Sequence, residues 1–99
     1  QSFELFQNYP NPFNPITSIR YAVYGSQLAD RRLIHTTLNI YNVLGQLVRT
    51  LVDEEKIPGE YQISWDGKDD SGSAVGSGIY FYQLKVGENS YSRKMALLR

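Results

Sequence analysis

The chain has 99 residues, which is enough for one hydrophobic core and a single domain. Hydrophobic residues make up 41% and charged residues 20%, a balance typical of a folded globular chain and not of a disordered tail. Ten basic and ten acidic residues cancel, so no net field favours nucleic acid or an anionic membrane as a partner. No apolar run approaches the roughly 20 residues of a membrane-spanning helix, and without cysteine no disulfide can support the core.

The first part of the chain predicts two strands separated by a proline-rich stretch. Alternating polarity predicts a short strand within Ser2–Gln7 and a longer one over Ile16–Tyr24. Between them, the three prolines of residues 8–15 remove backbone donors and favour an extended segment that is neither helix nor central strand. The polar stretch Gly25–Leu33 is expected to form a loop, or one helical turn with Ser26 as its N-cap.

The middle of the chain predicts a hairpin. A strand is expected over Ile34–Tyr41, followed by a turn in which Gly45 takes a positive φ and by a return strand over Gln46–Val52. The charged residues 53–56 are predicted to be an acidic loop leading to a turn at Pro58-Gly59.

Strands are also expected over Tyr61–Trp65, Tyr80–Val86 and Ser90–Leu98. The glycines of Gly76–Gly78 predict a tight turn into the strand over Tyr80–Val86, and Gly87–Asn89 predicts the turn that follows that strand. Seven short strands with regular turn signals predict an all-β, antiparallel, two-sheet sandwich, since no segment has a sustained helical period.

Few residues could carry chemistry. The single histidine, His35, lies on the polar face of its strand, which favours an exposed surface residue over a general base or metal ligand. Residues 66–72 are rich in Asp, but their spacing does not match an EF-hand, so a structural turn is favoured over a bound cation. Tyr41, Trp65 and Tyr80 could form a stacking platform for sugar rings, although strand parity favours burial of the last two. We therefore expect no catalytic residue, metal site or cofactor.

Four sequence segments carry a family resemblance. The runs QNYPNPFNP, IYNVLGQLVRTLVD, PGEYQISWDGKDDSGSAVGSGIYFYQLKVG and SRKMALLR resemble, in this order, the type A C-terminal sorting domain of type IX secretion substrates. The portion from WDGKDDSG to GIYFY is also similar to the Ig-like domain of the flagellar hook-capping protein. The resemblance implies a seven-stranded antiparallel Ig-like or fibronectin-like β-sandwich. Residues 24–33 depart from the family's pattern, because the connection there is longer and more charged.

The resemblance further implies that residues 1–99 are a single C-terminal sorting domain, with residues 8–15 as an extended lead-in. Its partners would be the outer-membrane secretion translocon, a processing peptidase or sortase, and a parent protein N-terminal to this domain. Neither nucleic acid nor membrane insertion is implied. The parent would be secreted or held at the cell surface after transit through the periplasm. The absence of an initiating methionine fits a fragment of a longer protein. The candidate sorting residues are Pro10, Asn11, Pro12, Gly78, Tyr80, Arg93, Lys94 and Arg99.

Charge is distributed unevenly: residues 53–72 hold seven acids and two bases, whereas residues 73–99 hold four bases and one acid. The two layers are expected to leave a basic tail, Lys94–Arg99, free for a receptor. Solvated loops and edges would explain the same charges, and Gly78 and Tyr80 could be turn and core residues.

The alternative function is a carbohydrate-binding or adhesive Ig-like accessory module of a secreted enzyme, or a structural spacer.

Overall fold

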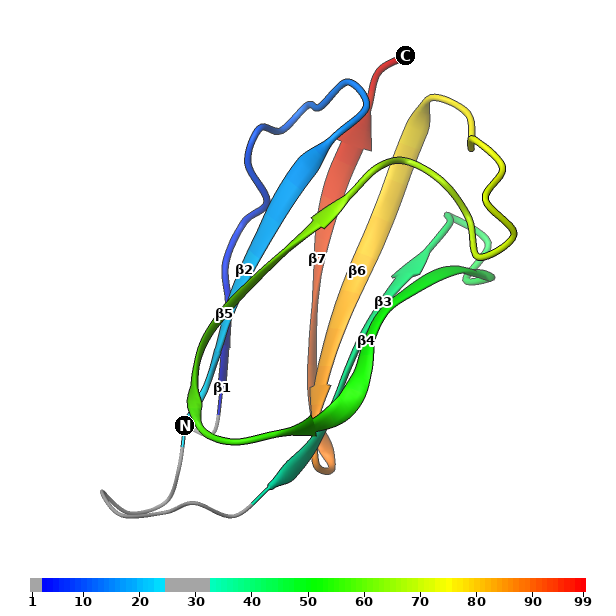
Figure 1. The fold of residues 1–99 in the computed structure, drawn as a ribbon. Helices are drawn as coiled ribbons and strands as arrows, with labels where there is room; N and C mark the ends of the chain where they lie inside the picture. The colour runs from blue at the N-terminus through cyan, green and yellow to red at the C-terminus, as the bar shows by residue number, and fades with distance from the viewer. Residues whose placement is uncertain (1–2, 25–32) are drawn as a thin grey trace.

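Seven strands form two antiparallel sheets in the computed structural model, which describes residues 3–24 and 33–99. One sheet has three strands in the order β1-β2-β5, and the other has four in the order β4-β3-β6-β7. Figure 1 shows the two sheets as facing layers, which confirms the predicted β-sandwich. The strands are β1 (Phe3–Leu5), β2 (Thr17–Val23), β3 (Ile34–Tyr41), β4 (Leu47–Lys56), β5 (Gly59–Trp65), β6 (Gly78–Val86) and β7 (Asn89–Leu97).

The core forms where the apolar rows of the two sheets face each other. Because side chains alternate across a strand, every second residue of the central strands is buried, as in the burial pattern of β3. The indole of Trp65 is fully buried, and the ring of Tyr80 meets it edge-on at 5.4 Å between centroids. The largest fully buried side chains are Trp65, Tyr21, Tyr82, Phe13, Ile19, Leu38, Ile40, Leu84, Met95 and Leu97.

The predicted acidic loop over residues 53–56 is wrong, because β4 continues through these residues to Lys56 and pairs with β3. Asp53 lies opposite Thr37 and Glu55 opposite His35. β4 is an edge strand with a solvent-exposed face, so charged side chains can occupy it without being buried. Cross-strand contacts to His35 then favour the extended backbone over a loop.

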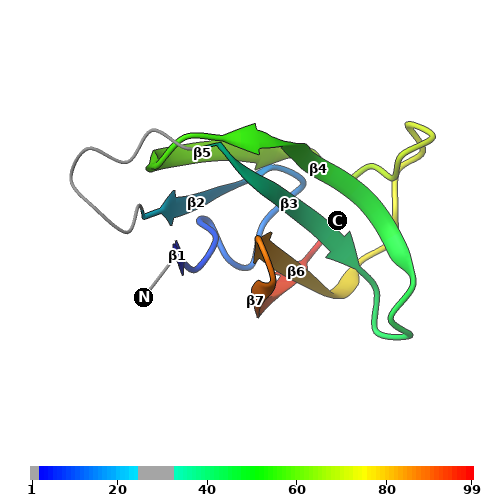
Figure 2. The same ribbon diagram turned by 90° about the horizontal axis from the view of Figure 1, so that it is seen from below.

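The connection from β4 to β5 carries the chain from the four-stranded to the three-stranded sheet at Ile57-Pro58, as Figures 1 and 2 show. The predicted hairpin turn is confirmed, since Gly45 has a φ of 80°. The first predicted strand is shorter than expected, and β1 covers only Phe3–Leu5. The loop or helical turn predicted behind Ser26 lies outside the described residues.

Candidate recognition surface along the C-terminal strand

Strand β7 brings together the sequence segments singled out above. Gly78 pairs with Leu97 and Tyr80 with Met95, so these two candidate residues lie directly beside the C-terminal segment. On the other edge of β7, the side-chain oxygen of Asn11 accepts a hydrogen bond from the Ala96 amide at 3.0 Å. Figure 1 shows the proline segment, defined here as residues 8–15, running alongside the C-terminal end of β7. Folding therefore joins segments from both ends of the chain.

Phe13 anchors the proline segment to the body of the domain. Its side chain is 1% exposed, and its ring centroid lies 5.7 Å from that of Trp65. Its amide donates to the Ala96 carbonyl at 3.0 Å, and its carbonyl accepts from the Leu98 amide at 2.9 Å. Because these bonds extend the sheet in parallel beyond β7, the segment is not a free linker. Sequence analysis did not single out Phe13, although an aromatic residue among prolines and polar residues could have indicated an anchor.

A buried hydrogen-bond network holds the beginning of the same segment. The hydroxyl of Tyr82 donates to the Phe6 carbonyl and accepts from the Asn8 amide, both at 2.8 Å. The Asn8 side chain donates to the Thr17 hydroxyl at 2.9 Å, and that hydroxyl donates to the Pro10 carbonyl at 2.9 Å. Burial raises the pKa of Tyr82 to about 12, so its hydroxyl stays protonated and can keep donating. Asn8 and Thr17 are further site residues that strand parity did not predict.

Tyr80 and Gly78 have structural positions. The Tyr80 ring packs on the core, its hydroxyl donates to the Gly76 carbonyl at 2.7 Å, and burial raises its pKa. Gly78 begins β6, and the space around its Cα is open, with nothing within 4 Å of an added Cβ. The phenol ring and its hydrogen bond therefore fix the turn that enters β6.

The expectation of a free basic tail is wrong. The Arg99 amide donates to the Ser77 hydroxyl at 2.8 Å, and its guanidinium donates to the Gly67 carbonyl at 2.6 Å and to the Val75 carbonyl. Gly67 makes room for this contact, because a Cβ there would lie 2.7 Å from the Arg99 Nη2. Arg99 thus closes the loop between β5 and β6: the Gly67 carbonyl accepts from both the Val75 amide and the guanidinium, whose several N–H groups can reach two carbonyls at once.

The other two basic candidates differ from each other. Arg93 is half-buried, and its Nε donates to the Leu5 carbonyl at 2.7 Å. Lys94 has an exposed side chain on the outer face of the four-stranded sheet, opposite Phe81 of β6, while its backbone carbonyl accepts from the Gln7 side chain at 2.9 Å. Lys94 is therefore the candidate base whose charge a partner can reach most directly.

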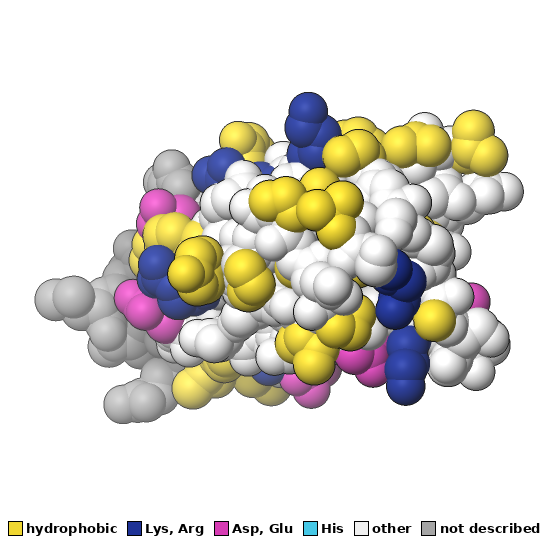
Figure 3. Space-filling model, turned by 90° about the horizontal axis from the view of Figure 1, so that it is seen from above, with side chains coloured by type: hydrophobic (Ala, Val, Ile, Leu, Met, Phe, Trp, Pro, Cys, Tyr) yellow, Lys and Arg dark blue, Asp and Glu magenta, His cyan; other side chains and the backbone are white. Residues whose placement is uncertain are grey.

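The surface at this end is rich in exposed apolar groups. Figure 3 shows hydrophobic side chains in several patches with Lys and Arg between them, and acidic side chains toward the rim. Tyr9 is 81% exposed, Ile16 56% and Leu98 55%. Tyr9 belongs to the proline segment, Ile16 follows it, and the Leu98 amide donates to Phe13 of the segment. Pro10, Asn11 and Pro12 are also exposed. Such a mixture of apolar and basic groups is typical of protein-binding surfaces.

The predicted chemistry candidates lie away from this surface or in the core. His35 is exposed and sits between two carboxylates, with its Nδ1 2.7 Å from Glu55 and its Nε2 2.9 Å from Asp53. The hydrogen bond to Glu55 is the main reason that the pKa of His35 is raised, with the charge of Asp53 adding to it. Trp65 and Tyr80 are 0% and 8% exposed, so neither ring face is available for stacking on a sugar.

The acidic residues 66–72 form a hydrogen-bonded turn. One oxygen of Asp69 accepts from the Ser71 amide and hydroxyl and from the Ser73 amide, and the hydroxyl bond is the main cause of the lowered pKa of Asp69. An oxygen of Asp70 accepts from the Thr50 amide of β4. Within residues 3–24 and 33–99, no group of three or more His, Cys, Asp or Glu side chains could hold a metal ion. The same residues contain no helix long and apolar enough to cross a membrane.

Known structures share this fold. The crystal structure of dimeric latent PorU from Porphyromonas gingivalis superposes with a TM-score of 0.75 over 97% of this chain at 20% identity. PorZ, an essential bacterial surface component of the type IX secretion system of P. gingivalis, superposes with a TM-score of 0.59 over 96% at 23% identity. FlgD from P. aeruginosa gives 0.51 over 97% at 16% identity. The chain spans only 9% of the PorU chain and 11% of the PorZ chain, and 67% of the FlgD chain.

A search of curated proteins gave no significant match. At these identities the structural matches establish the fold alone. The sequence itself, however, matches the FlgD Ig-like domain family over residues 26–90, which is more than half of the chain. This protein therefore belongs to the FlgD Ig-like domain family.

Proposed function

We propose that this domain is a non-catalytic C-terminal sorting signal, which directs a larger protein on its N-terminal side through the outer-membrane type IX translocon. The observation that carries the proposal is the meeting of the three motif segments at β7. A receptor contacts one surface, so residues as far apart in sequence as Asn11 and Lys94 can act as one signal only if folding places them together. The resemblance of these segments to type IX sorting domains supplies the functional class.

The proposal includes partners and a location. The partners are the translocon and a peptidase or sortase that processes the parent, and the parent reaches the medium or the cell surface after passing through the periplasm. Neither a cofactor nor nucleic acid takes part. The likeness to parts of PorU and PorZ is one of fold and agrees with this assignment, because PorZ is itself a type IX secretion component.

The surface that the translocon contacts would be folded and composite. The exposed Pro10, Asn11 and Pro12 lie on one side of β7, and Lys94 lies on its outer face. Removing the last five residues would be a poor test of recognition, because Met95 and Leu97 are 1% and 0% exposed and belong to the core. Point substitutions at exposed positions separate recognition from folding.

The test is to fuse residues 1–99 to a periplasmic reporter in a host with a type IX secretion system. The wild-type fusion should reach the medium or cell surface, and Lys94→Glu should hold the reporter in the periplasm. Lys85→Glu is the matched control, since it reverses an exposed lysine on the same sheet face and should leave export unchanged. A wild-type fusion that stays in the periplasm would overturn the proposal. Normal export of Lys94→Glu would remove this lysine from the recognised surface.

The carbohydrate-binding alternative has less support. Of its three candidate aromatics only Tyr41 is not buried, and it lies opposite Phe81 on the outer face of the four-stranded sheet. Retention of the wild-type domain on insoluble polysaccharide, abolished by Tyr41→Ala, would favour this alternative over the sorting function.

A further inference from the structure

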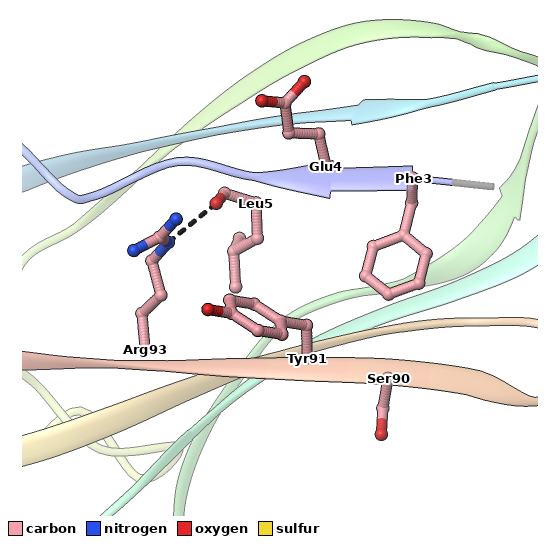
Figure 4. Close-up of a pocket in the computed structure, with 6 residues that line it drawn as sticks. All are labelled: Phe3, Glu4, Leu5, Ser90, Tyr91 and Arg93. Atoms are coloured by element: carbon pink, nitrogen blue, oxygen red, sulfur yellow. Dashed lines mark hydrogen bonds between the residues drawn. The ribbon is translucent and has the colours of Figure 1, made fainter. Parts of the chain in front are cut away.

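The edge strands β1 and β7 lie next to each other on one flank of the sandwich, with a groove between them. The groove has a volume of about 350 Å³. Figure 4 shows the side chains of Phe3 and Leu5 pointing from β1 toward Tyr91 of β7. The lining is completed by Glu4, Ser90 and Arg93.

The proline segment covers only one half of the outer edge of β7. Its bonds to β7 involve the amides of Ala96 and Leu98 and the carbonyl of Ala96, while Gln7 binds the carbonyl of Lys94. Even-numbered residues of β7 therefore direct their backbone groups away from β6. The pairing of β6 with β7 is continuous in register, so the same parity applies to Ser90 and Ser92.

The half of the edge beside the groove lacks such cover. Among the described parts of the chain, no hydrogen bond reaches the outward backbone groups of Ser90 or Ser92. Proteins usually block an edge with proline, a bulge, a covering segment or charged side chains. Among the described residues, this part of β7 has no proline and no bulge in its unbroken register, and its blocking charges are the cations Arg93 and Lys94, which disfavour a basic strand and not an acidic one. Unpaired backbone groups beside an apolar groove are the arrangement that binds an extended peptide by strand addition.

Arg93 adds a charged group at one end of the groove. Its Nε is occupied by the Leu5 carbonyl, and its guanidinium carbon lies 5.4 Å from the centroid of the Tyr91 ring. In the part of the chain that the structure describes, no carboxylate forms an ion pair with it, so its terminal nitrogens can bind one from outside. Tyr91 is 51% exposed and offers an apolar surface next to that charge.

We propose that this groove binds an extended acidic peptide segment of the secretion receptor, which adds to β7 at Ser90 and Ser92. A carboxylate of the peptide binds Arg93, and an apolar side chain two residues along the peptide, on the same face, packs on Tyr91. The guanidinium of Arg93 selects an acidic strand over a second copy of this chain, because Glu4, the acid in the lining, accepts a hydrogen bond from the Tyr24 hydroxyl. A second copy pairing through the same edge would bring its own Arg93 and Lys94 to a strip that already carries both cations. This inference rests on the proposed sorting function and specifies how the partner binds.

The test uses the 99-residue chain and two labelled, end-blocked peptides, Glu-Thr-Val-Thr-Glu-Thr and Lys-Thr-Val-Thr-Lys-Thr, which place their charged residues and the valine on the same face of a strand. Fluorescence anisotropy should show saturable binding of the acidic peptide, about tenfold tighter than that of the basic one, as a charge-assisted hydrogen bond requires. In ¹H–¹⁵N NMR spectra, the changes in backbone amide chemical shift on addition of the acidic peptide should centre on Ser90–Lys94. No binding at millimolar peptide, or shifts centred on another face, would overturn the inference. So would shifts of the same amides with protein concentration alone, which would indicate self-association.

Two substitutions locate the contact. Ser92→Pro removes the outward N–H at a position where an edge strand tolerates proline, and it should weaken binding about tenfold, whereas Ser92→Thr keeps the N–H and should not. Arg93→Gln removes the charge without a proline and should abolish the preference for the acidic peptide. Unchanged affinity in both Ser92→Pro and Arg93→Gln, with unchanged circular dichroism, would refute the site.

Export of the reporter separates this inference from the proposed function. If the wild-type fusion is exported but the acidic peptide does not bind, the groove is refuted and the sorting function stands. If the peptide binds as described but the fusion is not exported, the sorting function is refuted.

Discussion

Replacing Phe13 with alanine tests whether the proline segment is part of the folded domain. Removing a buried phenylalanine ring costs about 3–5 kcal/mol. Phe13 is 1% exposed and packs on Trp65, but its segment lies at a sheet edge and can partly collapse into the space. We therefore expect the lower end of that range, about 3 kcal/mol, which is a large part of the roughly 5–15 kcal/mol that stabilises a small domain.

The assay is urea unfolding followed by the fluorescence of Trp65, which Phe13 contacts directly. For a small protein the slope is about 1–3 kcal/mol per molar urea, so the midpoint should fall by about 1–3 M. Tyr9→Ala is the control in the same segment, because Tyr9 is 81% exposed, and should change stability by less than about 0.5 kcal/mol. A loss below about 1 kcal/mol for Phe13→Ala would mean that residues 8–15 behave as a linker.

Three further predictions concern stability. Tyr82→Phe leaves a buried amide and carbonyl without their partner and should cost about 1–3 kcal/mol in urea unfolding. Gly67→Ala should lower the melting temperature more than Gly72→Ala, since both have positive φ, at 73° and 88°, but only the first Cβ would collide with Arg99. Because the pKa of His35 is raised in the folded protein, the protonated imidazole stabilises the fold. The contribution of His35 to the free energy of unfolding is therefore fully present below the unfolded-state pKa of about 6.5, and it is lost as the pH rises through the folded-state pKa. Unfolding at about pH 5.5 and 8.5 should show this loss in the wild type and not in His35→Gln.

Each of these has a clear contrary result. Wild-type stability in Tyr82→Phe would show that the hydroxyl network does not hold the proline segment. Equal melting temperatures for the two glycine variants would mean that Arg99 moves away without cost. A wild-type protein that gains stability from this histidine as pH rises would contradict the sign of its pKa shift.

Strand positions were largely predictable because alternation at a period of two is a local property of the sequence. The predicted range Ile34–Tyr41 is the range of β3, and within it the alternate residues Thr36, Leu38 and Ile40 are buried. Residues 53–56 were not predictable in this way, because their four charges carry no apolar alternation and they are held extended by their pairing with β3. Contacts with a partner strand outside the local window decided the outcome.

The candidate surface was predictable only in its components. The resemblance singled out Asn11 and Lys94, but local patterns could not show that a side chain near the start would bind the backbone of Ala96 near the end. Proline removes its own donor, yet Phe13 among the prolines keeps its amide and uses it. The basic terminus was expected to be free because charges at chain ends are usually solvated, whereas Arg99 finds carbonyl partners over 20 residues earlier in sequence.

The strand order has a consequence for biosynthesis. β3, near the middle of the chain, lies between β4 and β6, and the four-stranded sheet is completed only by β7. The pairing of β3 with β6 joins strands that are not consecutive in sequence, and such non-local pairing slows folding. A nascent chain cannot close its core until residues 89–97 have left the ribosome, so the domain can form only after translation of its final strand.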